Sequence, residues 1–422
     1  MIQKIFVRCV SEDPEESDPL FTVDSSSNPA WRYIAFETPR LWSSFCISVG
    51  SWSDGNVLLG SQRLAEWGNR TKSAPLALVV QYRPEPRHTE SPLPDIFLPV
   101  LARSTQWRNV CLRIPARHFL EQPLRSSLDG RLIALERLRI DANTRLSALA
   151  APVSIGHVPS LHTVHLVGLP PTLISLPSRQ LTRFTGESFQ ADHCLHVLRQ
   201  TVSLVPCKFI QLLPRDVNQP ESFPPLRNLK SLTLQGPSAL SILRHLMLPA
   251  LLELDFAEQR LGLDQHHGDF VSFLSRSSPP LKRLSLYRSF QYLIHSTPFL
   301  SELAVLKMDS FPVPDMSDLL HLLREPANPF LPNLSSIHMS VWGSPHLDYA
   351  DVADTLEYRW SRIGGPRLEV FHVNLHRTDL SMNSRSPPNF RVILARLLDL
   401  VEQGMHISFV GVPRTGARQT WI

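Results

Sequence analysis

The sequence predicts an α/β fold in which short strands alternate with helices and stack into a solenoid. Three observations predict it. First, a short pattern recurs: an apolar residue, two variable residues, an apolar residue, one variable residue and a further apolar residue. Second, amphipathic stretches with helical spacing lie between the copies. Third, prolines precede many copies, where they end a helix and favour an extended entry into the next strand.

Ten copies of the pattern follow one another along the chain. They begin at Leu135, Leu161, Leu181, Leu204, Leu229, Leu251, Leu281, Leu303, Leu334 and Leu368. Their mean spacing is about 26 residues, within the roughly 20–29 residues of leucine-rich repeats. Similar strand-like segments lie upstream at Leu76 to Gln81 and Asn109 to Ile114, and Met405 to Val410 closes the array. One such unit cannot bury its apolar face alone, so we expect neighbouring units to stack on a continuous core.

Two alternatives stay open for this pattern. The chain has 66 leucines, so a loose template finds some matches by chance, although ten ordered copies with upstream prolines are hard to obtain from composition alone. A different α/β fold with parallel strands would show a similar alternation of strand and helix.

The strand register predicts which side chains face a partner. Successive residues of a strand point to opposite sides, so Leu138 and Ile140 face the core and Arg137 and Arg139 face outward. The candidate target-binding residues at equivalent outward positions are Arg137, Arg139, His165, Arg183, Lys208, Glu253, Asp255, Arg283, Lys307, His338 and His372. Six of them are Arg or Lys and two are acidic. Because arginine binds phosphate with two parallel hydrogen bonds, we expect an acidic or phosphorylated target protein. The alternative is a merely solvated face.

The first 75 residues do not share the pattern. Asn28 and Pro29 are typical of a helix start, Trp31 and Ile34 lie on one helical face, and Ser61 to Trp67 predicts a second short helix. We therefore divide the chain into a helical segment, residues 1–75, and a repeat array, residues 76–422.

Part of this segment resembles a known family. Ile5-Phe6, the run from Trp31 to Ala35 and the run from Thr38 to Ser44 are similar to the F-box of F-box/leucine-rich-repeat proteins, especially the large fungal set. The resemblance implies a substrate receptor of an SCF-type cullin ubiquitin ligase, acting in the cytoplasm or nucleus. The F-box would dock on a Skp-family linker protein while the repeats hold a target. The residues that would form or brace the docking helices are Ile5, Phe6, Trp31, Ile34 and Trp42.

The match departs from the family at two places. The family's opening Leu-Pro and most of its first helix would precede Ile5, and Pro29 interrupts a helix where the family has a Val-Cys-basic-basic run. An N-terminally truncated or degenerate F-box fits both departures. The alternative is a leucine-rich-repeat scaffold without a ligase role, in which residues 1–75 only cap the array.

Composition argues against several other classes. The formal net charge of +4 is small for 422 residues, so nucleic-acid binding is not expected. No apolar run approaches the roughly 18 residues of a membrane helix. Five scattered cysteines argue against a disulfide framework and fit a reducing compartment.

The sequence shows no catalytic constellation. The segment from Asp192 to His196 has metal-ligand residue types, but no second cluster completes four ligands, and residues 264–269 are read in the same way. A nucleophile elbow, a phosphate-binding glycine loop and a His-Glu-x-x-His motif are all missing. We expect a binding protein rather than an enzyme, with no catalytic residue, metal or cofactor.

Overall fold

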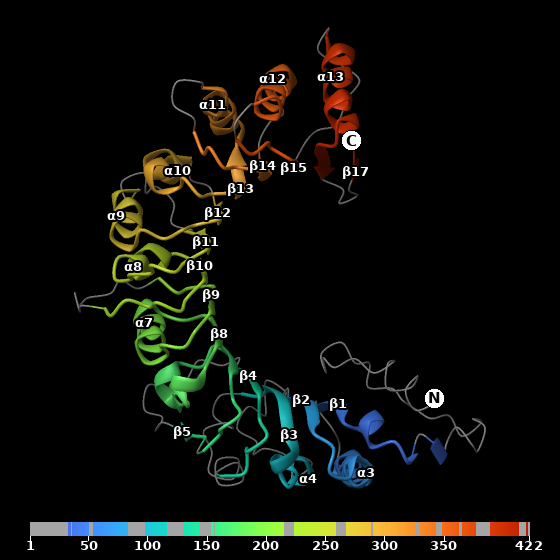
Figure 1. The fold of residues 1–422 in the computed structure, drawn as a ribbon. Helices are drawn as coiled ribbons and strands as arrows, with labels where there is room; N and C mark the ends of the chain where they lie inside the picture. The colour runs from blue at the N-terminus through green and yellow to red at the C-terminus, as the bar shows by residue number, and fades with distance from the viewer. Residues whose placement is uncertain are drawn as a thin grey trace. The chain divides into compact units, whose positions relative to one another are not determined.

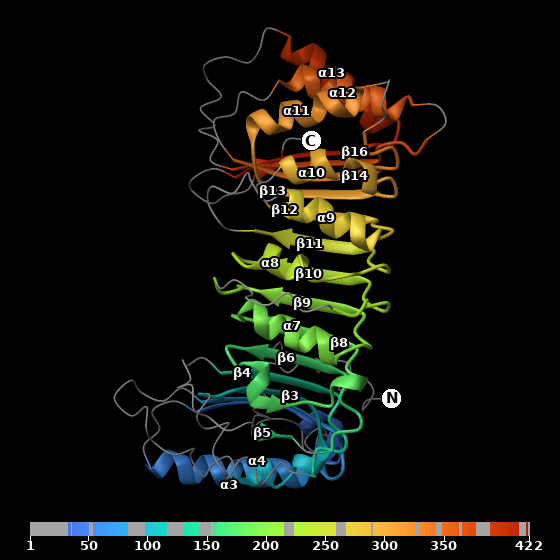
Figure 2. The same ribbon diagram turned by 90° about the vertical axis from the view of Figure 1, so that its left-hand side faces the viewer.

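The computed structural model describes most of the chain (Figures 1 and 2). The described residues are 33–34, 36–49, 54–82, 98–115, 130–142, 153–155, 157–214, 223–258, 267–287, 290–325, 330–342, 348–362, 365–376, 389–412 and 419–420. The chain divides into two compact units, Met1–Leu204 (unit 1) and Val205–Ile422 (unit 2). Both units are α/β and each is built on a parallel sheet. None of the helices in the described ranges combines the length and hydrophobicity that crossing a bilayer requires.

Unit 1 carries six parallel strands in the order β1-β2-β3-β4-β6-β8 among its described residues. The strands are β1 (Ser44–Val49), β2 (Leu76–Tyr82), β3 (Trp107–Arg113), β4 (Arg137–Asp141), β6 (Thr163–Val167) and β8 (Arg183–Glu187), with a separate parallel pair, β5 (Val153–Ser154) and β7 (Ile174–Ser175). The helices are η1 (Pro39–Trp42), α3 (Asp54–Thr71), α4 (Leu98–Leu101), η4 (Ser104–Gln106), η5 (Pro171–Leu173), η6 (Ser178–Gln180) and α7 (Ala191–Gln200).

Unit 2 continues in the same style, with strands that neighbour one another in chain order from β9 to β17. Its strands are β9 (Pro206–Ile210), β10 (Ser231–Gln235), β11 (Glu253–Ala257), β12 (Arg283–Tyr287), β13 (Val305–Pro312), β14 (Ser336–Trp342), β15 (Val370–His376), β16 (His406–Val412) and β17 (Gln419–Thr420). Its helices are α8 (Ala239–Leu243), α9 (His267–Ser277), α10 (Phe290–Ser296), η7 (Thr297–Phe299), α11 (Val313–Arg324), α12 (Tyr349–Trp360) and α13 (Phe390–Glu402). Only β17 is antiparallel, against β16, among the strands described in this unit.

The predicted alternation of strand and helix on a parallel sheet is confirmed. Every copy of the sequence pattern contains a strand, as do the two upstream segments and the segment at Met405. In unit 2, helices α8 to α12 lie along one side of the strands (Figure 1). A proline before a strand favours an extended backbone at the strand's start. Because parallel strands cannot be joined by a tight hairpin, the chain returns through a helix or a longer turn before the next strand.

The core of unit 2 contains a ladder of apolar side chains, one from each of the strands β10 to β15. The ladder joins Leu232, Leu254, Leu284, Leu306, Ile337 and Phe371 in direct register. All are essentially inaccessible to solvent. Phe270 of α9 and Tyr292 of α10 close over Phe256 of β11, with ring centroids 5.3 to 5.5 Å apart. Each strand therefore buries its apolar residue between its two neighbours rather than within its own repeat.

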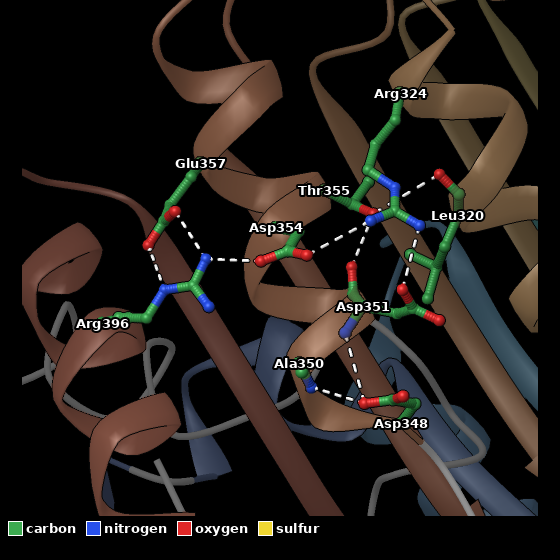
Figure 3. A network of polar contacts seen from close by, with 9 residues as sticks. All are labelled: Leu320, Arg324, Asp348, Ala350, Asp351, Asp354, Thr355, Glu357 and Arg396. Carbon is green, nitrogen blue, oxygen red and sulfur yellow. Dashed lines mark hydrogen bonds and ion pairs between the residues drawn. The ribbon is translucent and has the colours of Figure 1, made fainter. Parts of the chain in front are cut away.

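An ion-pair network fastens the last three helices to one another (Figure 3). Arg324 of α11 contacts Asp351 at 2.9 Å and Asp354 at 3.4 Å, both on α12. From α13, Arg396 contacts the same Asp354 at 2.6 Å and Glu357 at 2.7 Å. Asp354 therefore links the helices on either side of α12. The network joins α11, α12 and α13.

Strand β1 was not expected from the sequence. It lies inside residues 1–75, yet it pairs with β2 in parallel register, with Cys46 opposite Val79. Phe45 and Ile47 are buried while Ser44 and Cys46 are half-buried, so the short run does alternate as a strand should. Helix α3 also extends beyond the predicted Ser61 to Trp67. The sheet of unit 1 thus begins before the predicted boundary at residue 75.

Candidate functional site

The candidate site is the side of each sheet that carries the outward strand residues, here called the open face. Leu284 and Leu286 of β12 are buried while Arg283 is exposed and Ser285 is half-buried. Apolar residues on one side of a strand and polar residues on the other produce this division. The open face therefore presents side chains that the core does not need.

In unit 1, the register brings the predicted residues of three strands into two rows. Arg137 and Arg183 flank Thr163 in one row, and Arg139 neighbours His165 in the next. Arg137 and Arg183 are exposed. His165 Nε2 lies 2.7 Å from Glu187 Oε1, a residue at the end of β8 that the sequence analysis did not select. The two exposed arginines are the side chains most available to an anionic partner here.

In unit 2, two rows of the open face contain all seven remaining candidates. The first row runs Ser231, Glu253, Arg283, Val305, Ser336, Val370 and His406. The second row runs Lys208, Thr233, Asp255, Ser285, Lys307, His338, His372 and Ser408. The structure thus places Glu253 beside Arg283, while Asp255 lies between Thr233 and Ser285.

The two acidic candidates lie together on β11. Glu253 Oε1 lies 4.0 Å from Arg283 Nε, and both side chains are about half exposed, so this pair contributes little to stability. Burial raises the pKa of Asp255, and the nearby Asp309 raises it further. A hydrogen bond from Gln235 at 3.2 Å opposes these effects, as does the charge of the lysines Lys208 and Lys307.

A polar recess of about 390 Å³ opens at the carboxyl ends of the strands of unit 2. Its polar lining residues are Gln235, Asp255, Ser285, Tyr287, Asp309, Ser310, Ser340 and His376. Ser340 Oγ lies 3.0 Å from His376 Nε2. A bulge between β13 and β14 shifts the register after Met308, and Ser310 has a positive φ of 55°. Bulges redirect side chains. This bulge lies at the edge of the polar recess, which is lined by both hydrogen-bond donors and acceptors.

A second recess of about 470 Å³, here called the histidine recess, lies at the other end of strands β14 to β16. It is lined by His338, Val370, Phe371, His372, Val401, Met405, His406, Ile407 and Ser408. The rings of His338 and His372 have centroids 5.8 Å apart. His338 Nε2 also lies 2.9 Å from Ser336 Oγ. The recess joins an apolar floor to three imidazoles.

Burial lowers the pKa of His338, and the positive charges of Lys307, His372 and Arg283 lower it further. Both causes disfavour the imidazolium form. The neutral form of His338 is therefore favoured.

The predicted linker-binding residues divide into two groups. Ile5, Phe6 and Trp31 lie outside the described residues. Ile34 is half-buried, and its carbonyl accepts a hydrogen bond from Thr38 Oγ1 at 2.6 Å. Trp42 is buried within the chain itself.

The environment of Trp42 comes mainly from helix α3. The Trp67 ring meets Trp42 edge-on, with centroids 6.3 Å apart, and the Arg70 guanidinium lies 4.6 Å from the centroid of the Trp42 ring. Phe45 of β1 stacks on Trp67 at 4.7 Å. Trp42 therefore braces η1 against α3, and sequence spacing alone did not reveal these partners.

The residue types that suggested metal binding are not assembled into a site within the described ranges. No group of three or more His, Cys, Asp or Glu side chains is placed there to hold a metal ion. His193 lies edge-on to Phe189, and burial together with Arg199 lowers the pKa of His196. Residues 264–266 fall outside the described part of the chain.

Several residues of the two recesses were missed by the sequence analysis. The register of β15 and β16 places His406 in the same row as Glu253 and Arg283. A segment that begins at Met405 puts it one position earlier than those residues, so the sequence pattern did not select it. Ser340 and His376 lie beyond the six-residue template, because β14 and β15 each have seven residues. The bulge at Asp309 leaves no periodic signal in the sequence.

Comparison with known proteins adds no name to these residues. No protein-family model matches the chain, and no curated protein matches it. The features of the described residues that bear on function are therefore the open face and the cluster around Trp42.

Proposed function

We propose that this protein is a leucine-rich-repeat receptor that binds a target protein on its open face and presents it to an SCF-type ubiquitin ligase. The observation that carries the proposal is the open face of unit 2. Two in-register rows of mostly charged and hydrogen-bonding side chains run across the strands, one from β10 to β16 and one from β9 to β16. The helices α8 to α12 lie along one side of these strands (Figure 1). A solenoid with such a face offers an extended surface to another protein.

The leucine-rich-repeat assignment rests on period and packing together. The sequence pattern recurs at about 26 residues, inside the usual range for these repeats. Each copy supplies one short strand and a ladder residue such as Leu254 or Leu284, and the return segment varies from 3₁₀ turns to helices of three turns. A short strand followed by a helix or a 3₁₀ segment in each unit is compatible with this repeat class.

The ligase role rests on the N-terminal resemblance. Residues 1–44 carry the F-box-like runs, and in the described part Trp42 fixes η1 to helix α3. In this proposal Ile5, Phe6, Trp31 and Ile34 contact the Skp-family linker, and Trp42 braces that surface from behind. A receptor of this kind does no chemistry: it raises the local concentration of the target beside the ligase, in the cytoplasm or nucleus.

A repeat scaffold without a ligase role is the second candidate, and one observation favours it. The cluster of Trp42, Trp67 and Phe45 lies at β1, which is the first strand of the sheet in unit 1. Repeat arrays need their terminal apolar ends covered. A segment that serves wholly as such a cover would bind no linker.

Co-purification with the Skp-family linker of the same organism separates the two candidates. The full chain is compared with a version lacking residues 1–32, which keeps Trp42 and its contacts with α3. Circular dichroism verifies that both remain folded. The ligase role predicts linker with the full chain and none with the shortened one. If the full chain is folded but retains no linker, the repeat scaffold without a ligase role is the function that remains.

A further inference from the structure

We propose that the open face between β12 and β16 binds an acidic segment of the target that carries an apolar residue, and that its histidines strengthen this binding as the pH falls. The inference rests on the target-binding part of the proposed function. It concerns the surface formed by Arg283, Lys307 and the histidine recess.

Positive and protonatable groups dominate this surface. Arg283, Lys307, His338, His372 and His406 come from five successive strands. Lys307, His338 and His372 are direct neighbours in the second row. On the open face of these five strands, Asp309 is the single carboxylate among the described residues. Opposite charges across an interface select partners, so this surface favours an anionic segment.

The apolar side chains that line the histidine recess favour a bound segment that carries an apolar residue. Val370 comes from β15, while Val401 and Met405 come from the end of α13 and the turn that follows it. These side chains carry no charge, and they line a space of about 470 Å³ between the imidazoles. A peptide that places a large apolar side chain there sets its flanking carboxylates against His338, His372 and His406. Burying such an anchor in a pocket supplies much of an interface's affinity.

The pH dependence follows from the surroundings of His338. Lys307 of β13 and His372 of β15 are its direct neighbours in the row, and Arg283 of β12 adds a further positive charge. His406 of β16 lines the same recess, to which α13 contributes the uncharged Val401. Burial and the neighbouring positive charges lower its pKa in the free protein. A bound carboxylate favours the imidazolium and raises the pKa of His338 in the complex. Binding then takes up a proton, and uptake of one proton strengthens binding by about tenfold per pH unit between the two pKa values.

The test uses a fluorescent peptide with the sequence Glu-Glu-Phe-Glu-Glu and the full chain. Fluorescence anisotropy gives its affinity at pH 7.5 and pH 5.5, and Lys-Lys-Phe-Lys-Lys is the control peptide. We expect the acidic peptide to bind about tenfold more tightly at pH 5.5 than at pH 7.5. The basic peptide should bind more weakly than the acidic one at both pH values. The double variant His338→Gln/His372→Gln should lose most of this pH dependence. His321→Gln, at an exposed position on α11, is the matched control and should keep it.

Circular dichroism verifies that each variant is folded at both pH values. Equal affinity at the two pH values, or an unchanged pH dependence in the double variant, would overturn the histidine mechanism. Absence of binding of the acidic peptide at pH 5.5 would overturn the acidic partner. None of these results affects linker co-purification, which tests residues 1–32. The proposal of an acidic target and the proposal of a ligase role can therefore fail independently.

Discussion

Arg396 of α13 holds Glu357 of α12 through two parallel hydrogen bonds, from Nε and from Nη2, each 2.7 Å long. The same guanidinium reaches Asp354 at 2.6 Å, and these carboxylates raise its pKa. Two-point arginine–carboxylate pairs have more specific geometry than single contacts. The pair therefore orients α13 against the rest of unit 2.

Removing this contact should destabilise the protein modestly. For Arg396→Ala we expect a loss of about 1 kcal/mol in the free energy of unfolding, because the side chains are partly exposed but act as a network. Urea unfolding measures it. Arg391→Ala, at an exposed position on the same helix, should change stability by less than about 0.5 kcal/mol. Equal losses in the two variants would contradict a role for the network.

The leucine ladder should be far less tolerant. Leu284 is fully buried between Leu254 and Leu306. Leu284→Ala removes buried methyl groups and leaves a cavity, so we expect about 2–5 kcal/mol of destabilisation. Thermal and urea unfolding test this. Gln291→Ala, at an exposed position on α10, serves as the control. A loss below about 1 kcal/mol at Leu284 would mean that the repeats do not share one core.

Gly236 should accept no side chain. Its φ is +136°, and a Cβ there would lie 2.5 Å from the backbone nitrogen of Leu212. Gly236→Ala therefore combines backbone strain with a collision, and we expect about 1–3 kcal/mol of destabilisation. At Gly268 in α9 nothing lies within 4 Å of the position that a Cβ would take, and φ is not positive, so Gly268→Ala should be neutral or slightly stabilising. Chemical unfolding of both variants checks the contrast, and similar losses at both positions would refute it.

Cys207 should be unreactive while the protein is folded. It is fully buried on β9, and burial raises the pKa of its thiol. Because the thiolate is the reactive form, alkylation with iodoacetamide at pH 8 should label Cys207 only after unfolding. Peptide mass spectrometry gives the labelling of each cysteine. The half-buried Cys46 should react faster and acts as an internal reference. Early labelling of Cys207 would mean that β9 opens readily.

The features of the fold that the sequence predicts are those that repeat with a regular period. Strands with alternating leucines, such as Leu284 and Leu286, were predictable because burial on one side repeats every second residue. The same alternation predicts Lys307, His338 and His372 on one face, where the structure has them as direct neighbours. The sequence could not predict how deep each outward residue lies: Asp255 is half-buried although its template position is an outward one, whereas Glu253 two residues earlier is exposed.

Other features depend on contacts between residues far apart in the chain. The link from Trp42 to Trp67 and Arg70 joins segments that carry no shared pattern. Strand β1 was missed because its six residues follow a run that was assigned to the F-box resemblance. The bulge at Asp309 and the extra length of β14 and β15 created the polar recess, and local backbone irregularity of that kind has no period to detect.

The central claim is that the open face selects a target protein. The most direct measurement is quantitative mass spectrometry of proteins co-purifying with the full chain and with the variant Arg137→Glu/Arg139→Glu/Arg283→Glu. If the open face selects the target, at least one acidic protein is lost from the variant, while the linker protein is retained at an equal level. Recovery of the same proteins, in the same amounts, with both versions would show that the open face does not select a target.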